Sequence, residues 1–225
     1  MFYYYGRKKK IAKLYPQPLH EIIVEPFAGA AAYSLHKDNW KKEVILVEKD
    51  QQVAAVWEWL INEATPQVIK NLPDLKKGDK SSEFLQIVHA ASKQAFKYKT
   101  IKVTSVLERN WEISKRVMAA DLHKIKHWEL IQGDYADAPD VVATWFIDPP
   151  YKGAAGLGYN HSSANLDYKA LAEWTQTRNG GVIFCEGVEG DYLPFLPLVD
   201  MKGVAGKVNL EKVYYQGDFN PKTTP

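Results

Sequence analysis

Short apolar runs, each closed by an acidic residue or a turn, set the strongest limit on how this chain folds. The clearest is Ala143–Ile147, which leads directly into Asp148. Similar runs occupy Glu21–Phe27, Lys42–Val47 and Gly181–Cys185. Runs of this length, rich in β-branched and aromatic residues, are typical of strands buried on both faces of a parallel sheet.

Segments with helical periodicity lie between these runs. Val53–Ala64 spaces its apolar residues three and four positions apart, and Asp167–Arg178 begins with an aspartate suited to cap a helix. Ala28–Leu35 is small and helix-prone, so we expect a turn that feeds a helix. The alternation predicts an α/β fold with a mostly parallel sheet. The remaining expected strands are Trp128–Gln132 and an antiparallel edge pair, Val204–Val208 with Lys212–Tyr215.

Residues 66–126 differ from their surroundings and are predicted to be a small helical lobe inserted into a single domain of residues 1–225. Between Lys76 and Lys126 there are ten Lys and two Arg against five acidic residues, a net charge of +7. Helices are expected at Glu83–Phe96 and Val106–Met118. The basic residues alternate with aromatic ones, an arrangement that suits phosphate contacts and base stacking, although charge runs are more often solvated faces. The aromatic residues are Phe96, Tyr98 and Trp111.

Bulk composition indicates an ordinary globular protein. The chain has 225 residues, 46% hydrophobic and 25% charged, with a net charge of only +2. Its single cysteine, Cys185, excludes an intrachain disulfide and fits a reducing cytosol. No cleavable signal and no apolar stretch near the ~20 residues needed to span a bilayer are visible. We therefore expect a cytoplasmic protein that does not enter membranes.

The turn after the first expected strand, Pro26–Ala32, is nearly free of large side chains. Ligands approach backbone closely only at such places, and a helix beginning there presents free N–H groups. The turn therefore suits a nucleoside cofactor, although a helix packed tightly on the sheet has the same composition. The three-glycine dinucleotide fingerprint is absent from it.

Acidic residues follow two other expected strands. Glu48 ends the second strand, where an acid commonly holds ribose hydroxyls, although a solvated acid beside Lys49 and Asp50 is an equally simple interpretation. Asp134 has the same ambiguity, and one use for it is to accept a hydrogen bond from an adenine amino group.

Asp148-Pro149-Pro150-Tyr151 is the most specific signal, because ligands bind at the carboxyl ends of strands in open α/β sheets. The exocyclic amine of adenine is a poor nucleophile, since its lone pair is delocalised into the ring. Two acceptors on its N–H bonds free that lone pair, and the Asp148 carboxylate and the Pro149 carbonyl suit this role. Tyr151 offers a ring on which a base stacks. The alternative is a purely structural Pro-Pro turn.

Other reactive residue types carry weaker signals. His89, His123 and His127 have no Cys, Asp or Glu at ligand spacing, so no metal site is expected. Cys185 lies inside an apolar run and is expected to be a buried, inert thiol.

The motifs, in this order, resemble those of the DNA adenine N6-methyltransferases of the Dam-like group, in particular its small phage-type members. The matching residues are Tyr4-Tyr5-Gly6-Arg7-Lys8, Glu25-Pro26-Phe27-Ala28-Gly29-Ala30, Glu48, Gly133-Asp134-Tyr135 and Asp148-Pro149-Pro150-Tyr151. The basic lobe lies where that family has its target-recognition lobe. The resemblance covers most of residues 3–195, in patches.

The resemblance implies a Rossmann-like fold of the S-adenosylmethionine-dependent methyltransferase type and duplex DNA as substrate, with the target adenine flipped out of the helix. No metal is implied, and a monomer in a bacterial or phage-infected cytosol is expected. Tyr5 and Lys8 would lie near the methionine end of the cofactor, Glu25 to Ala30 would pack on it, Glu48 beside Lys49 would hold its ribose, and Asp134 beside Tyr135 its adenine. Asp148, Pro149, Pro150 and Tyr151 would hold the target base.

Two departures from the family pattern limit what it implies. Ala31 stands where the cofactor turn usually has its second glycine, so the backbone approach is more restricted. The lobe is short and matches no known recognition element, so the target sequence stays open.

The alternative functions have a similar fold but differ in substrate or activity. Methylation of RNA adenine, of cytosine N4 or of a protein glutamine amide uses similar motifs, and Asp148 favours adenine among these. A catalytically silent nucleic-acid-binding relative is the alternative from another class. A nucleotide-dependent oxidoreductase is disfavoured by the missing glycine fingerprint.

Overall fold

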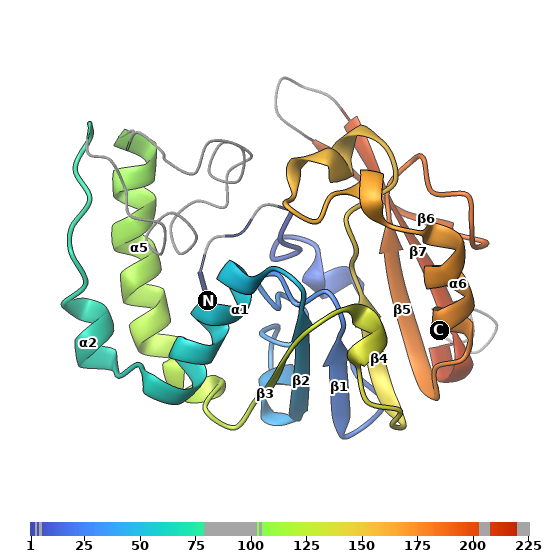
Figure 1. Cartoon of the computed structure of the whole chain (residues 1–225), viewed down its shortest axis with the longest axis horizontal. Coiled ribbons are helices and arrows are strands. Elements are labelled where there is room, and N and C mark those ends of the chain that lie inside the picture. The colour runs from blue at the N-terminus through green and yellow to red at the C-terminus, as the bar shows by residue number, and fades with distance from the viewer. Residues whose placement is uncertain (3, 5, 79–102, 104, 203–207, 220–225) are drawn as a thin grey trace.

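The computed structural model describes residues 1–2, 4, 6–78, 103, 105–202 and 208–219. Their centre is a seven-stranded sheet (Figure 1). The strands are β1 (Ile22–Glu25), β2 (Glu43–Glu48), β3 (Glu129–Gln132), β4 (Ala143–Ile147), β5 (Gly180–Glu186), β6 (Leu196–Lys202) and β7 (Val208–Gln216).

The strand order is β3-β2-β1-β4-β5-β7-β6. β1 to β5 are mutually parallel, whereas β7 is antiparallel to both β5 and β6. The chain leaves β1 towards β3 on one side and later returns through β4 on the other, so the order reverses between β1 and β4. In doubly wound sheets a crevice opens at the carboxyl ends of the strands at such a point.

Both faces of the central strands are buried, as their apolar sequences predict. Along β4 and β5 alternate side chains enter opposite cores, with Phe146 and Ile183 on one face and Trp145 and Val182 on the other. Helix α1 (Gln51–Glu58) contributes Trp57 to the first core, and helix α6 (Tyr168–Gln176) contributes Leu171 to the second. The expected α/β architecture with a mostly parallel sheet is confirmed.

The helix ends follow ordinary capping chemistry. Asp50 accepts a hydrogen bond from the Gln52 N–H at the start of α1, and Asp167 accepts from two N–H groups at the start of α6. The α1 helix continues as a turn of π-helix, η3 (Trp59–Glu63), and together they cover the expected helical segment. No helix in the described part of the chain has both the length and the apolarity needed to cross a membrane.

Two helices of the expected lobe are described, α2 (Pro66–Lys70) and α5 (Ser105–Asp121). They pack on each other beside the β3 end of the sheet (Figure 1). The Trp111 indole N–H donates to the Pro73 carbonyl at 2.7 Å. The helix expected at Glu83–Phe96 lies outside the described residues, as do His89, Phe96 and Tyr98.

Two expectations about local structure are wrong. Ala28–Leu35 forms successive turns rather than a helix, because Gly29 and Ala31 have φ angles of +47° and +46°. The Tyr33 ring fixes these turns by stacking on Phe146, with centroids 4.4 Å apart. In the C-terminal part, β7 pairs with Leu196–Lys202 rather than with Val204–Val208, and residues 203–207 are outside the described chain. β7 is also an interior strand, since β5 lies on its other side.

The end of η3 depends on one ammonium group. Lys126 Nζ donates to the carbonyls of Leu60, Ile61 and Ala64 at 3.0, 2.9 and 2.8 Å. A π-turn leaves carbonyls that the regular helical ladder does not satisfy, so this lysine stabilises the exit from the helix.

Lys126→Met should therefore lower the free energy of unfolding by about 1–2 kcal/mol, because three charge-assisted hydrogen bonds are lost. Lys124→Met is the matched control. Lys124 makes an i,i+3 pair with Asp121 at 2.8 Å, and removing such a surface pair should change stability by less than ~0.5 kcal/mol. Urea denaturation followed by circular dichroism measures both, and equal effects would contradict a special role for Lys126.

Candidate active site at the carboxyl end of the sheet

A pocket opens where the strand order reverses, at the carboxyl ends of β1, β2 and β4. Its empty volume, with the open mouth included, is about 730 Å³. The lining residues come from the N-terminal segment, the ends of β1, β2 and β4, the turn after β3 and the loop after β4. They are Tyr4, Gly6, Arg7, Lys8, Glu25 to Ala32, Glu48, Lys49, Asp50, Tyr135, Phe146, Asp148, Pro150, Tyr159, Asn160 and His161.

Most of the residues expected from the sequence meet at this pocket. The turn from Glu25 to Ala32, Lys8, Glu48, Lys49, Tyr135, Asp148 and Pro150 all line it. Asp134, Pro149 and Tyr151 adjoin lining residues but are not themselves part of the lining. Tyr5 lies outside the described residues.

The turn after β1 is held by side chains rather than by a helix. The Gly29 N–H donates to Glu48 Oε2 at 2.9 Å, and the Trp57 indole N–H donates to the Gly29 carbonyl at 2.9 Å. A β-carbon on Gly29 would lie 3.2 Å from the Tyr4 ring, closer than ordinary van der Waals contact. The free N–H groups expected from a helix start are thus replaced by a turn whose central N–H is bound to a carboxylate.

Glu48 is buried and is fixed by backbone donors. Its other oxygen accepts from the Asp50 N–H at 2.9 Å. Burial raises the pKa of Glu48 to about 7, although the N–H bonds of Asp50 and Gly29 oppose that rise. The carboxyl group is therefore held in one orientation at the pocket wall by backbone donors.

Asp134 does not line the pocket, although the lysine that it pairs with does. Its carboxylate pairs with Lys49 at 2.5 Å and caps the 3-10 helix η5 (Tyr135–Asp137). The neighbouring Tyr135 reaches the pocket instead and stacks on Phe27, with ring centroids 5.6 Å apart and an interplanar angle of 27°. At this place in the site the structure offers an aromatic pair rather than a free carboxylate.

Asp148 follows β4 and pairs with Lys8. Lys8 Nζ lies 2.7 Å from Asp148 Oδ1 and 4.6 Å from the centre of the Tyr151 ring. Burial raises the pKa of Asp148 to about 6, while Lys8 opposes that rise. Burial also acts to lower the pKa of Lys8, but the Asp148 and Glu211 carboxylates outweigh it and the pKa is raised. At neutral pH the pair is thus a carboxylate and an ammonium.

The residues after Asp148 are anchored on both sides. The Tyr168 hydroxyl of α6 donates to the Pro150 carbonyl at 2.8 Å. The Tyr151 hydroxyl donates to Glu211 on β7 at 2.5 Å. Pro149 is buried between them. The segment is therefore held from α6 and from the antiparallel strand at the same time.

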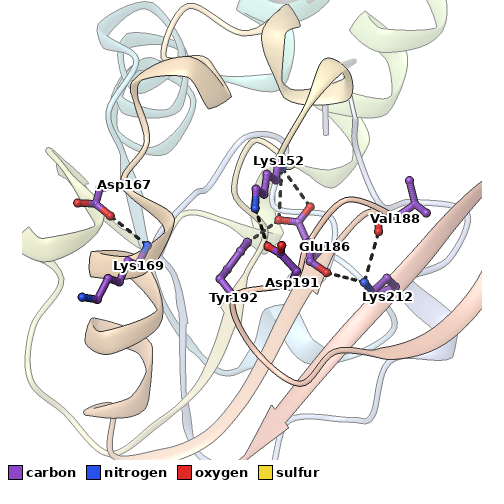
Figure 2. A network of polar contacts seen from close by, with 9 residues as sticks. Lys152, Asp167, Lys169, Glu186, Val188, Asp191, Tyr192 and Lys212 are labelled. Carbon is purple, nitrogen blue, oxygen red and sulfur yellow. Dashed lines mark hydrogen bonds and ion pairs between the residues drawn. The ribbon is translucent and has the colours of Figure 1, made fainter.

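A second polar network supports the residue after Tyr151 (Figure 2). Glu186, fully buried at the end of β5, accepts from the Lys152 N–H at 3.2 Å and from the Tyr192 hydroxyl at 2.5 Å. Lys152 Nζ pairs with Asp191, so the loop of residues 187–192 folds back towards β4. A β-carbon on Gly187 would lie 3.0 Å from the Tyr151 ring, and the loop thus closes one side of that ring.

Sequence reasoning missed Glu186, Glu211 and Tyr15. Glu211 is 6% exposed and shares a face of β7 with the buried Val213. The period of two along Glu211, Val213 and Tyr215 is a signal that points this acid towards the core. Nothing in the sequence indicates that Tyr15, 196 residues away, donates to it at 2.8 Å.

Within the described residues, no cluster of three or more His, Cys, Asp or Glu side chains is arranged to hold a metal ion. Cys185 is fully buried, as expected, and burial raises its pKa well above the usual value. It is therefore a thiol rather than a thiolate.

Glu25 should make stability depend on pH. Burial raises its pKa to about 8, opposed by its bond from the Ser34 N–H. The folded chain thus keeps a proton that the unfolded chain loses near the usual carboxyl pKa, so the free energy of unfolding falls as pH rises from about 4.5 to 8.

Glu25→Gln should remove much of this slope. When the pH is raised from 5 to 8.5, the free energy of unfolding of Glu25→Gln should increase relative to that of the parent by on the order of 3 kcal/mol. Urea titrations at several pH values measure this difference. Glu21→Gln is the control, because Glu21 is 89% exposed and should leave the slope unchanged. A parent-like slope in Glu25→Gln would show that this carboxyl is not protonated in the folded state.

Comparison with known proteins adds no relative to these observations. No protein-family model matches the chain, and a search of curated proteins gives no significant match.

Proposed function

We propose that this protein is an S-adenosylmethionine-dependent methyltransferase that acts on the N6 amine of adenine in DNA. The observation that carries the proposal is that Asp148 opens into the same pocket as the turn after β1 and Glu48. Methyl transfer requires donor and acceptor to meet in one cavity, and these residues come from three neighbouring strands, β2, β1 and β4.

The buried acids of the pocket favour a cationic ligand more strongly as pH rises, because burial raises the pKa of Glu48 to about 7 and that of Glu25 to about 8. Three of its lining acids, Glu25, Glu48 and Asp50, are buried, and Lys8 is the one cation among its buried lining residues. S-adenosylmethionine carries a sulfonium, an ammonium and one carboxylate, for a net charge of +1. Once these acids are ionised, phosphate-bearing cofactors such as dinucleotides would meet them unfavourably, whereas the cationic methyl donor fits the residues present.

The chain's own residues have distinct roles in this proposal. Glu48 would accept hydrogen bonds from ribose hydroxyls, and Tyr135 with Phe27 would flank the base of the cofactor. When bound, S-adenosylmethionine would supply an electrophilic methyl group. Asp148, ionised above pH 6, would accept an N–H of the target amine and orient the nitrogen lone pair towards the pocket. The Tyr151 ring would stack on the extruded base.

Lys8 must change partner when the target arrives. Its ammonium pairs with Asp148 and lies over the Tyr151 ring. Both contacts are ones that the target base would make. The lysine therefore satisfies the carboxylate until a substrate amine replaces it.

Basic residues near the mouth support DNA as the partner. Arg7, Lys9 and Lys10 are exposed next to Lys8, and Arg7 lines the pocket. Cations beside a pocket that receives a flipped base are suitably placed to contact the phosphates of the opened strand.

The decisive experiment is transfer of an isotope-labelled methyl group to unmodified duplex DNA, followed by digestion to nucleosides and mass spectrometry. N6-methyldeoxyadenosine is the expected product. Asp148→Ala should reduce the rate by at least ~10³, because the acceptor that orients the amine is lost. Asp140→Asn is the matched control, since Asp140 is exposed before β4, where it lies 3.9 Å from Arg178 and accepts a hydrogen bond from Asn179 at 3.3 Å, and it does not line the pocket.

Product from Asp148→Ala at the parent rate would overturn the assignment of Asp148. Methylated RNA or protein amide in place of methylated DNA would overturn the substrate and keep the chemistry. A folded parent protein without measurable S-adenosylmethionine binding would overturn the proposed function altogether.

Cofactor selectivity gives an independent prediction. The demethylated product, S-adenosylhomocysteine, lacks the sulfonium charge. Because burial raises the pKa of Glu48 to about 7 and that of Glu25 to about 8, the pocket becomes more negative between pH 6 and 8.5. The preference for S-adenosylmethionine over its product should rise about 3- to 10-fold over this range. Isothermal titration calorimetry measures both affinities, and a constant or falling ratio would contradict the charge argument.

A further inference from the structure

Two hydroxyl donors and a nearby ammonium converge on one buried carboxylate oxygen that the proposed chemistry does not use. Glu211 Oε1 accepts from the Tyr15 hydroxyl at 2.8 Å and from the Tyr151 hydroxyl at 2.5 Å, and it lies 3.9 Å from Lys8 Nζ. Glu211 comes from β7, the antiparallel strand, and is 6% exposed. A buried carboxylate is retained only where donors satisfy it, and here two of the three groups belong to the segments around Asp148.

The position of Tyr151 is fixed through this oxygen. The Lys8 ammonium lies over the Tyr151 ring, Gly187 closes in on the ring from the loop after β5, and the hydroxyl is bound to Glu211. The ring is thus constrained by its hydroxyl as well as by its neighbours. Because the ring is already held in one place before the substrate binds, binding does not have to include the entropy cost of ordering it.

The charges form a set of two carboxylates and one ammonium. Lys8 is 2.7 Å from Asp148 and 3.9 Å from Glu211. If the target amine takes Asp148, the displaced ammonium still has a buried anion within a short movement of its side chain. Without Glu211 the lysine would have to stay on Asp148 or leave for solvent.

We propose that Glu211 is a positioning residue of this site, which holds the Tyr151 ring through its hydroxyl and provides the second anionic partner to which Lys8 moves when a target amine occupies Asp148. The catalytic meaning of this assignment rests on the proposed methyltransferase function. The electrostatic coupling of Glu211 to Asp148 does not depend on that function, and it is measured without any substrate.

The coupling has a defined direction. Burial is the main cause of the raised pKa of Asp148, Lys8 opposes the rise, and Glu211 adds to it. The titratable and charged groups that interact with Asp148 come from several elements packed around it. They are Lys8, Tyr4 and Tyr15 of the N-terminal segment, Glu25 of β1, Tyr151, Cys185 and Glu186 of β5, and Glu211 of β7.

The test is a carboxyl carbon-13 NMR titration of full-length protein labelled at aspartate, with the Asp148 signal assigned from its loss in Asp148→Asn. Glu211→Gln keeps the shape and an oxygen acceptor for the tyrosines but removes the charge. The pKa of Asp148 should fall by about one unit from its parent value. Glu186→Gln is the matched control, because Glu186 is an equally buried carboxylate that accepts from Tyr192; it should move the pKa of Asp148 by less than ~0.3 units.

An unchanged Asp148 pKa in folded Glu211→Gln, or an equal fall in both variants, would overturn the proposal. Should Glu211→Gln fail to fold, Lys8→Met gives a second test, since it leaves the two carboxylates without their cation. The Asp148 signal should then show two titration steps, because a second buried carboxylate lies close to it without a neutralising cation. A single independent step for Asp148 would count against the assignment.

Activity measurements separate this proposal from the proposed function. If the parent methylates DNA, Glu211→Gln should lower kcat about 10-fold or more and shift the acid limb of the kcat profile to lower pH. If kcat falls only because less of the Glu211→Gln protein is folded, and its pH profile is unchanged, Glu211 has only a structural role. If the parent methylates nothing, the proposed function fails, while the titration still decides whether Glu211 is coupled to Asp148.

Discussion

Carboxylates withdrawn from water at the carboxyl edge of the sheet are the constraint around which this structure is organised. An unsatisfied buried carboxylate is strongly unfavourable, and each one recruits donors from a different part of the chain. The acids at the ends of the parallel strands bind turns at this edge or the N-terminal segment, and the acid on the antiparallel strand binds the N-terminal segment and the loop after β4. The pairs are Glu25 with Ser34, Glu48 with Gly29 and Asp50, Asp148 with Lys8, Glu186 with Lys152 and Tyr192, and Glu211 with Tyr15 and Tyr151. Loops without regular secondary structure are therefore ordered by their hydrogen bonds and ion pairs with the carboxylates of the site that they enclose.

The parallel strands and the placement of Asp148 were predictable because they depend on local patterns. An apolar run of five residues that ends in an acid specifies a buried strand and the edge at which it terminates. The turn after β1 was recognised by its small residues, but its conformation was not, since Tyr33 stacking on Phe146 and two left-handed backbone positions override the helix propensity of alanine. Tertiary contacts determine the conformation of that segment, and they cannot be inferred from the local sequence pattern.

The orientation of the polar side chains was the least predictable part. Asp134 and Tyr135 are neighbours in the sequence, yet the carboxylate turns to Lys49 while the ring lines the pocket. The choice depends on a lysine 85 residues away. Glu211 lies on a strand that sequence periodicity locates, but its partners come from the other end of the chain. Residue types and strand ends thus predict where a site is, and long-range partners determine what each group does there.

The antiparallel strand has a consequence for how the protein is made. Tyr15 and Glu211 are separated by 196 positions, so the last carboxylate of the site emerges from the ribosome long after the N-terminal tyrosine and Lys8. A nascent chain that has completed only β1 to β5 presents Lys8 with Asp148 alone and leaves the hydroxyls of Tyr15 and Tyr151 without their acceptor. Contacts of such long range form late and slowly. Assembly of the pocket is thus tied to completion of the C-terminal hairpin, and translation products that stop short of it would lack the finished site.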